Sequence, residues 1–219
     1  MLTYDILRHD ESIKTYIRSA DAALEAQGYT EHSFAHVTKV AETAGYIMSE
    51  TGHTEHEVEQ VKIAAYLHDI GNLVNRVEHS QSGAVMAFRI LLAMNMDASD
   101  VSAIVSAIGN HDEGCGVPVN DISAALILAD KSDVRRSRVR NRDMATFDIH
   151  DRVNYSVSDS SLMVDKNKKE IVLRLTIDTE FASVMEYFEI FLERMLLCRK
   201  ASDKLGYRFR LYINEQKVI

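Results

Sequence analysis

Six side chains that carry ligand atoms for metal ions are spread along the first 130 residues of the 219-residue chain. Most of them lie where an apolar segment begins or ends, and a buried carboxylate there is costly unless it is paired or coordinated. Imidazoles and carboxylates together suit divalent ions. The sequence therefore predicts a site for one or two ions of iron, manganese, nickel, magnesium or zinc. The predicted ligands are His36, His68, Asp69, His79, His111 and Asp130.

The segment AAYLHDIGN, residues 64–72, places His68 and Asp69 at the end of an apolar run. Neighbouring residues of a helix project about 100° apart, so these two side chains cannot share a face of an intact helix. Gly71 allows the helix to unwind here, which would let both side chains point to one place. We expect His68 to bind one ion. Asp69, the predicted catalytic residue, would bridge to a second ion or orient the attacking water.

Hydrophobic periodicity predicts the elements that must bring these ligands together. One helix start has a specific signature, because Thr54-x-x-Glu57 can form a capping box. A helical bundle can aim side chains from several helices at one interior point, so the six ligands are expected to converge inside such a bundle. The predicted helices cover residues 10–27, 31–51, 54–68, 79–94 and 99–110, and a sixth runs from 121 past Asp130.

The pattern changes after Asp143. SLMVD and EIVLRLTID, on either side of a polar turn at 166–168, alternate as the strands of a hairpin do. Thr179 is a candidate cap for a long helix, and YRFRLYI resembles a final strand. The predicted fold class is mainly α, with a helical bundle over residues 1–145 and a small α+β module (ββαβ) over residues 146–219. The stripe predicted on the long helix is Phe181, Val184, Met185, Phe188, Leu192 and Met195.

A basic segment, KSDVRRSRVRNR, follows Asp130 immediately and holds six basic residues. Lys131, Arg135 and Arg138 follow helical spacing and could share one face. The planar guanidinium group of arginine matches phosphate oxygens. These three residues are therefore predicted to bind a small phosphorylated substrate. The simpler alternative is a solvated helix and loop that bind nothing.

Composition limits the class of protein. Charged residues make up 26% and apolar residues 46% of the chain, as in soluble globular proteins. No apolar run approaches the roughly 20 residues of a membrane span, and the N-terminus lacks a signal pattern, so a cytoplasmic location is expected. The net charge of −8 argues against extended nucleic-acid binding. Cys115 and Cys198 are expected to be free thiols.

His36, His68-Asp69 and Asp130 resemble the H…HD…D signature of the HD-domain superfamily of metal-dependent phosphohydrolases. The resemblance covers roughly residues 30–140 and includes HSFAHVTKVAETA, AAYLHDIGN and LILADKSD in that order. It implies an HD-type helical bundle. It also implies hydrolysis of a phosphate ester or anhydride of a small, nucleotide-like substrate through metal-activated water. EHSQSGAVMA resembles the segment that supplies an extra ligand in dinuclear members, here His79.

NHDEGCGVP, around His111, loosely resembles a segment of the HD-GYP cyclic-dinucleotide phosphodiesterases. Asn110 replaces the first of two histidines in that segment, and Asn72 replaces a lysine usual after HDIG. The complete ligand set also resembles HD hydrolases that cleave diadenosine tetraphosphate, and HD-type di-iron oxygenases. Three functions stay open: a phosphohydrolase, a di-iron oxygenase, and a non-catalytic module that senses a ligand.

Several other features have more than one interpretation. His32 is expected at the surface or as a helix cap, with the cavity mouth as the alternative. Glu113 could support the metal site or lie exposed in its loop. The module at residues 146–219 could cover the cavity or form a homodimer, which the exposed strand edges of a small sheet favour.

Overall fold

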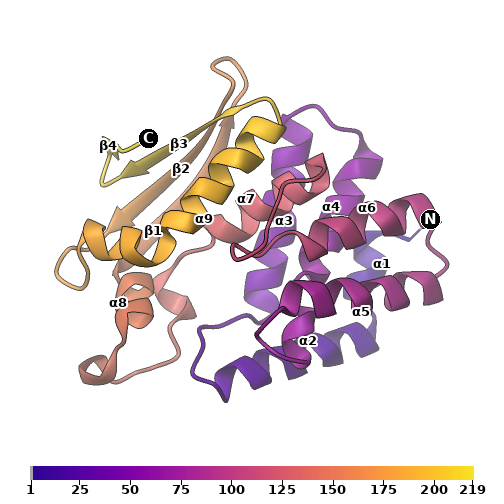
Figure 1. Ribbon diagram of the computed structural model, residues 1–219, viewed down its shortest axis with the longest axis horizontal. Helices are drawn as coiled ribbons and strands as arrows, with labels where there is room; N and C mark the ends of the chain where they lie inside the picture. Colours follow the sequence, from indigo (N-terminus) through magenta and orange to yellow (C-terminus); the bar gives the residue numbers. More distant parts are fainter. Residues whose placement is uncertain (1) are drawn as a thin grey trace.

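The computed structural model describes residues 2–219, and Figure 1 shows a group of helices beside a small sheet crossed by one long helix. The helical part, in chain order, is α1 (Tyr4–Arg8), α2 (Glu11–Glu25), α3 (Phe34–Glu50), α4 (Glu55–Leu67), η1 (Ile70–Leu73), α5 (His79–Ala93), α6 (Ala98–Gly109), α7 (Asp121–Ser132), η2 (Arg136–Arg138) and η3 (Met144–Thr146). The rest is α8 (Ile149–Ser156), β1 (Val157–Asp165), β2 (Glu170–Ile177), α9 (Val184–Lys204), β3 (Arg208–Ile213) and β4 (Gln216–Lys217).

Side-chain caps determine where the main helices begin. Ser33 caps α3, and Thr54 with Glu57 forms the capping box at the start of α4, which confirms that prediction. Asn120 and Ser123 form a second capping box at α7. These side chains bond to backbone N–H groups that the first turn of a helix leaves without a partner. The six predicted helices are found within a few residues of their expected bounds, and the short α1 was missed.

Helix α3 lies at the centre of the helical part, where it packs against α4 and α7. Helix α7 is buried over most of its length, because its residues 122–129 are apolar or small on every side. The predicted ligands His36 on α3, His68 at the end of α4 and Asp130 on α7 therefore come from helices that pack on one another. Packing of these apolar faces is what brings the three side chains together.

The C-terminal module is a sheet with strand order β1-β2-β3-β4. The predicted hairpin is confirmed, since β1 and β2 pair antiparallel. Strand β3 lies parallel to β2, and α9 makes the crossover between them. The predicted ββαβ order misses α8 before the sheet and the two-residue strand β4. A strand of two residues is too short to show an alternating pattern. The predicted homodimer stays a prediction.

With Thr179 as its cap, α9 would begin at residue 180, but the helix begins four residues later, at Val184. Ser183 is the cap, and it forms a capping box with Glu186, so the helix starts at Val184. The sequence Ser-x-x-Glu carried this signal, whereas Thr179 is exposed and lies in a turn. The prediction of Thr179 as the cap is wrong.

The predicted apolar stripe on α9 is right only in part. Met195 is buried, but Met185 is 69% exposed and Leu192 is 49% exposed. Helix α9 packs against α7 as well as against the sheet, so its buried surface is wider than one stripe and is rotated away from these two residues. Its buried residues are Tyr187, Phe191, Met195, Leu197, Cys198, Ala201 and Ser202.

The module shares its packing with the helical part. The backbone N–H of Val164 in β1 donates to the Tyr46 hydroxyl of α3 at 3.2 Å. Strand β1 and helix α9 both contact α7, and buried residues of the two parts form one continuous core. The division at residue 145 stays a prediction, and the shared core means that the two parts stabilise each other.

The basic segment does not continue α7. The helix ends at Ser132, and residues 136–138 form a separate 3₁₀ turn. Lys131, Arg135 and Arg138 therefore do not share a helical face, and the prediction based on their helical spacing is wrong. The chain turns at Asp133, whose buried carboxylate draws basic side chains toward it.

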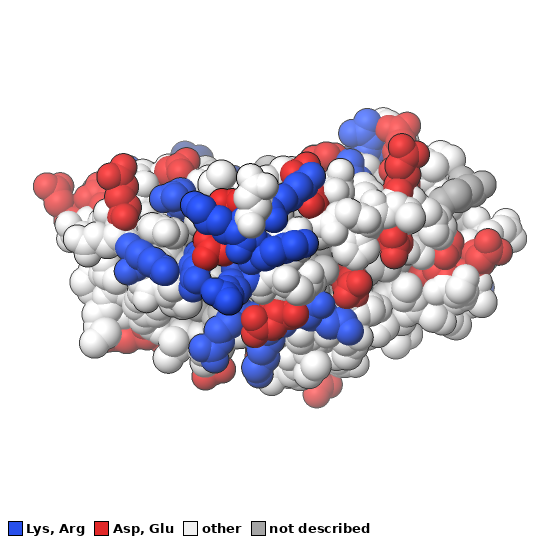
Figure 2. Space-filling model, turned by 90° about the horizontal axis from the view of Figure 1, so that it is seen from above, with Lys and Arg blue, Asp and Glu red and all other residues white. Residues whose placement is uncertain are grey.

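Charge is distributed unevenly over the surface. In the view from above, Lys and Arg gather where Figure 1 places the β1–β2 turn and the C-terminal end of α9 (Figure 2). Exposed cations of these elements include Lys168, Lys204 and Arg208. The predicted absence of extended nucleic-acid binding rested on net charge and stays a prediction.

Among residues 2–219, no helix is both long and apolar enough to cross a membrane. Both cysteines are free thiols, as predicted.

Gly71 permits a close approach of two backbones. The φ of Gly71 lies outside the left-handed region, so the backbone conformation here does not require a glycine. A Cβ at Gly71 would lie 1.9 Å from the carbonyl oxygen of His79 and 2.4 Å from the backbone nitrogen of Gly83. This contact holds η1 against α5, and it keeps the start of α5 beside the end of α4.

Gly71→Ala is expected to destabilise the protein by roughly 1–3 kcal/mol, because the added carbon must push η1 away from α5. Urea unfolding at equilibrium measures the change in the free energy of unfolding. Gly109→Ala is the matched control, since its Cβ would meet no atom outside its own helix closer than 3.6 Å. Equal effects of the two substitutions would contradict the close-approach argument.

Candidate metal centre

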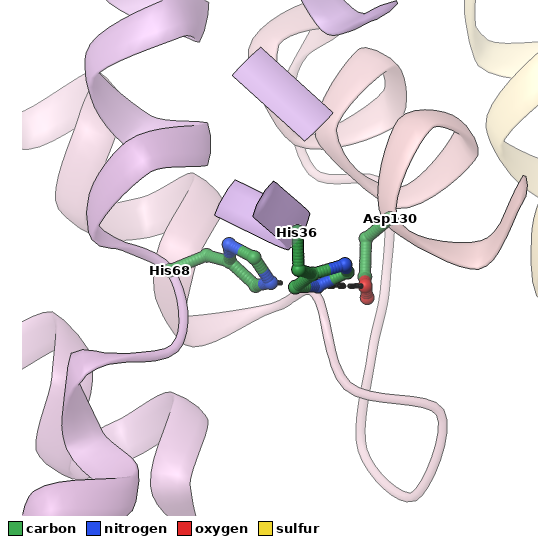
Figure 3. Close-up of side chains that lie close together, drawn as sticks. All are labelled: His36, His68 and Asp130. Atoms are coloured by element: carbon green, nitrogen blue, oxygen red, sulfur yellow. Dashed lines mark ion pairs between the residues drawn. The ribbon is translucent and has the colours of Figure 1, made fainter. Parts of the chain in front are cut away.

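The structure brings all six predicted ligands together where α3, α4, α5, α6 and α7 meet. His36, on α3, and His68, at the end of α4, have fully buried side chains, and the side chain of Asp130, on α7, is 12% exposed. Figure 3 shows the rings of His36 and His68 side by side, with the Asp130 carboxylate next to them. Two groups have ligand atoms within 4.8 Å of one another: His36, His68 and Asp130, and His68, Asp69 and His111.

In three of the imidazoles, the Nδ1 atom is held by a backbone carbonyl group earlier in the chain. The Nδ1 atoms of His68, His79 and His111 lie 2.6, 3.1 and 2.7 Å from the carbonyl oxygen three residues earlier. A carbonyl oxygen can only accept, so each Nδ1 must carry the hydrogen. A neutral ring of this tautomer has its lone pair on Nε2, which is the atom left to bind a metal ion.

His36 is oriented by a carboxylate. Its Nδ1 lies 2.8 Å from Asp133 Oδ2, and Asp133 is 1% exposed. Burial alone would raise the pKa of Asp133, but the hydrogen bond from His36 and the charge of Arg138 hold that pKa far below its usual range. Lys39 Nζ and Arg135 Nε also contact Asp133 Oδ1, each at 2.9 Å. The Asp133 carboxylate is therefore ionised and fixes the His36 ring.

The Nε2 atoms of His36 and His68 lie at ion-pair distance from carboxylates, outside hydrogen-bond geometry. His36 Nε2 lies 3.3 Å from Asp130 Oδ1, and His68 Nε2 lies 3.2 Å from Asp69 Oδ2. Among the described residues, neither nitrogen has a hydrogen-bond partner. A buried polar atom left unpaired costs about 1–3 kcal/mol. Nitrogens and carboxylates that converge on common points, rather than on each other, fit a site for metal ions.

Asp69 faces both halves of the cluster. Its Oδ2 lies 3.6 Å from His36 Nε2 as well as 3.2 Å from His68 Nε2. Its Oδ1 lies 3.5 Å from His79 Nε2, which in turn is 3.3 Å from His111 Nε2. The two oxygens of one carboxylate thus address two sets of imidazoles, which is the arrangement that a bridging ligand requires.

The unwinding predicted after α4 is observed. The helix ends at Leu67, Asp69 has φ −97° and ψ 0°, and the 3₁₀ turn η1 follows. Asn72 in that turn is buried, and its side-chain amide donates to Asp69 Oδ1 at 3.0 Å. The change of backbone direction and this hydrogen bond aim Asp69 at the same centre as His68.

Burial and neighbouring charges shift the pKa values of His68 and His111 in opposite directions. For His68, burial lowers the pKa, but the charges of Asp69 and Asp130 outweigh it and raise the pKa to about 10. For His111, burial and the nearby charges of His68 and Lys131 lower the pKa to about 3. The pKa of Asp69 is held well below its usual range by His68, against the effect of burial.

A cavity of about 390 Å³ opens beside the cluster, within the size range of small-molecule sites. Asp69, His79, His111 and Asp130 form part of its wall, and Phe191 of α9 forms another part. Residues far apart in the sequence, including α9, therefore close one space. Four of the six candidate ligands are therefore accessible from the cavity, and His36 and His68 lie buried behind them.

Lys131 and Arg138 line this cavity, as the prediction of substrate contacts requires. The ammonium group of Lys131 lies 2.7 Å from Asp130 Oδ2 and also pairs with Glu113. Arg138 is buried and donates to the backbone carbonyl oxygens of Glu31 and Asp133. Acceptor groups of the protein therefore partly compensate the positive charges of Lys131 and Arg138.

Arg135 lies outside the cavity wall. Its guanidinium group contacts Asp133 Oδ1 at 2.9 Å and Glu31 Oε2 at 3.2 Å. Arg135 therefore helps to compensate the buried Asp133 carboxylate, and its predicted contact with substrate stays a prediction.

His32 and Glu113 each had two predicted positions, and both lie at the one nearer the site, in the cavity wall. His32 lines the cavity, and its ring centroid lies 5.4 Å from that of His36. Burial and the charge of Arg138 hold the pKa of His32 well below its usual range. Glu113 Oε1 accepts from Arg194 Nε and Nη2 at 3.0 and 2.9 Å, which ties the loop after His111 to α9.

Sequence reasoning missed three residues of the site. Asp133 stands three residues after Asp130 in the same acidic ending of an apolar helix, and that spacing was a usable signal. Arg76 precedes His79 by three residues in a turn, and Arg194 lies on α9, more than 50 residues after the last ligand. Both line the cavity, and neither carries a local pattern that indicates it.

One protein family matches the chain over more than half of its length. The model of the HD domain family matches residues 33–148, more than half of the chain. Among solved structures, a protein from an uncultured Thermotogales bacterium, described as a predicted HD superfamily hydrolase, is 28% identical with a TM-score of 0.47. The match covers 58% of this chain and 69% of that one. No curated protein matches the chain. The match over residues 33–148, together with the ordered residues His36, His68-Asp69 and Asp130, shows that the chain belongs to the HD domain family.

Proposed function

We propose that this protein is a metal-dependent phosphohydrolase with a two-ion centre, acting on a phosphate ester or anhydride of a small, nucleotide-sized substrate. The observation that carries the proposal is the set of four imidazoles whose Nδ1 atoms are held by fixed oxygens. The Nε2 atoms of His36, His68 and His79 face Asp69 or Asp130, and that of His111 lies beside His79 Nε2. The cavity beside them has basic residues in its wall, which suits an anionic substrate.

Each ligand has a definite place in this proposal. His36, His68 and Asp130 would hold one ion, His79 and His111 would hold the other, and Asp69 would bridge them. Divalent ions bound here would activate a water molecule and offset the negative charge of the phosphate. The physiological metal is left open among iron, manganese, nickel, magnesium and zinc, because the donor set does not select among them.

The protein's own groups orient the reactants. Asp69 is ionised and sits between the two sets of imidazoles, so its carboxylate can accept a hydrogen bond from the attacking water and align it. Lys131 and Arg138 place positive charge along the cavity wall and would attract a phosphate. Phe191 of α9 provides an apolar surface for the organic part of the substrate.

The same ligands would serve a di-iron oxygenase. The cavity wall holds four cationic side chains beside six carboxylates. The cations favour the phosphohydrolase, since an oxygenase substrate has no general need for them. Oxygen-dependent turnover by the iron-loaded protein, without release of phosphate from any ester, would support the oxygenase instead.

Asp69→Asn is expected to lower hydrolysis of p-nitrophenyl phosphate and bis(p-nitrophenyl) phosphate at least about 100-fold, since it removes the bridging and water-aligning charge. The assay uses protein reconstituted with Mn²⁺, and metal analysis by mass spectrometry is expected to show fewer bound ions in the variant. Asp97→Asn is the matched control, because Asp97 is exposed and makes no side-chain capping bond. Unchanged turnover in Asp69→Asn would sink the proposed role.

Metal binding is expected to release about one proton per chain at pH 8, because His68, with a pKa raised to about 10, is protonated in the metal-free protein and must lose that proton to act as a ligand. Metal affinity should therefore rise with pH until about pH 10. Calorimetric titration with Mn²⁺ in buffers of different ionisation enthalpy counts the protons.

His111→Gln provides the control for this proton count. The pKa of His111 is lowered to about 3, so its ring is already neutral at pH 8 and releases nothing on binding. The variant should bind metal more weakly and still release about one proton. If the wild-type protein binds Mn²⁺ without proton release, the assignment of charge to His68 is wrong.

A further inference from the structure

Four cationic side chains line the cavity, and they differ in how their charge is compensated. Lys131 pairs with Asp130 and Glu113, Arg194 pairs with Glu113, and Arg138 lies 3.9 Å from Asp133 Oδ2. Arg76 also lines the cavity. Within residues 2–219, it is the one of these four with no carboxylate oxygen within 4.0 Å.

The polar contacts of Arg76 are few and long. Its Nη1 lies 3.3 Å from Asn72 Oδ1 and 3.4 Å from His79 Nε2. A guanidinium group has five N–H donors and no acceptor, so most of its hydrogen-bonding capacity is unused by these two contacts. The Arg76 Cζ atom lies 5.6 Å from the centroid of the Tyr29 ring, which helps to hold the guanidinium group in place.

One of these contacts is incompatible with metal binding by His79. Nδ1 of His79 bonds to the backbone, so its Nε2 lone pair is the one that accepts from Arg76. The same lone pair is the one that His79 would use as a ligand. When His79 binds a metal ion through this lone pair, Arg76 loses His79 as a hydrogen-bond partner. The N–H donors of Arg76 beside the cavity are then available for an anion.

We propose that Arg76 is the phosphate-binding residue of this cavity, donating to the oxygens of the substrate's phosphate group from beside His79. The inference rests on the proposed function and adds the residue that recognises the substrate class. The planar arrangement of guanidinium N–H groups matches two phosphate oxygens at once. Lys131 and Arg138 would attract the phosphate at longer range without binding it directly, because their charges, like that of Arg194, mainly compensate carboxylates of the protein.

The arrangement also links phosphate binding to the catalytic carboxylate. Asn72 donates to Asp69 Oδ1 at 3.0 Å and accepts from Arg76 at 3.3 Å. A single buried amide therefore connects the phosphate-binding cation to the bridging carboxylate. This connection orients Arg76 relative to Asp69.

The test is calorimetric titration of the Mn²⁺-loaded protein with inorganic phosphate. Arg76→Gln is expected to weaken phosphate binding by about 10- to 100-fold, the range for hydrogen bonds to a charged group. Arg76→Lys should recover part of the affinity, because it keeps the charge and loses the planar fork. Metal content, measured by mass spectrometry, should stay at the wild-type level in both variants.

Arg18→Gln is the matched control. Arg18 is exposed on α2, its Cζ atom lies 5.5 Å from the centroid of the Phe34 ring, and it is outside the cavity wall. Arg194→Gln is the competing variant, since Arg194 lines the cavity but is paired with Glu113. Phosphate affinity is expected to be unchanged in Arg18→Gln and to fall less in Arg194→Gln than in Arg76→Gln.

Four results would overturn the inference, and three of them concern phosphate: no phosphate binding by the loaded wild-type protein, unchanged phosphate affinity in Arg76→Gln, or a larger loss in Arg194→Gln. Loss of metal in Arg76→Gln would likewise overturn it and assign Arg76 a structural role beside His79. The titration needs no turnover. A loaded protein that binds phosphate through Arg76 but hydrolyses no ester would therefore contradict the proposed function and leave this inference standing.

Discussion

The site depends on one repeated interaction, a hydrogen bond from the Nδ1 of each imidazole to a fixed oxygen. In His68, His79 and His111 the acceptor is the carbonyl oxygen three residues earlier, and in His36 it is the carboxylate of Asp133. These bonds set the tautomer and the ring orientation together, so the Nε2 atoms converge on Asp69 and Asp130. Without them, rotation of each ring would let the nitrogens pair with neighbouring carboxylates and fill the space that the ligands share.

The second requirement is compensation of buried charge. Asp133 is buried to fix His36, and Lys39, Arg135 and Arg138 lie around it. Lys131, Glu113 and Arg194 form a further chain of contacts from Asp130 to α9. Removing one member of such a chain leaves an uncompensated buried charge, which is far more costly than removing an exposed one. The basic segment after Asp130 is thus mostly structural, and the C-terminal helix is electrostatically tied to the centre.

Much of the fold could be predicted from the sequence, because helix starts and buried faces are local properties. Thr54 with Glu57, and the periodic runs up to α7, placed the helices that carry the ligands, and alternation placed the hairpin. The errors have local causes too. The cap predicted at Thr179 overlooks the Ser183 capping box, and the predicted helical spacing continues past Ser132, where the chain turns at Asp133. The role of Gly71 also differs from its predicted one, because it serves a contact with α5 that is distant in sequence.

The sequence by itself determined the identities of the six candidate ligands and the family, since residue type, order and placement at helix ends are readable along the chain. Only the tertiary structure decided how Asp69 divides its two oxygens between two sets of imidazoles. It also decided which cations are neutralised within the protein, and that Arg76 has no carboxylate partner among residues 2–219. These properties depend on distances between side chains from different elements. Arg135 and Arg76 look equivalent in sequence, yet Arg135 lies against the buried Asp133 carboxylate and Arg76 faces the cavity.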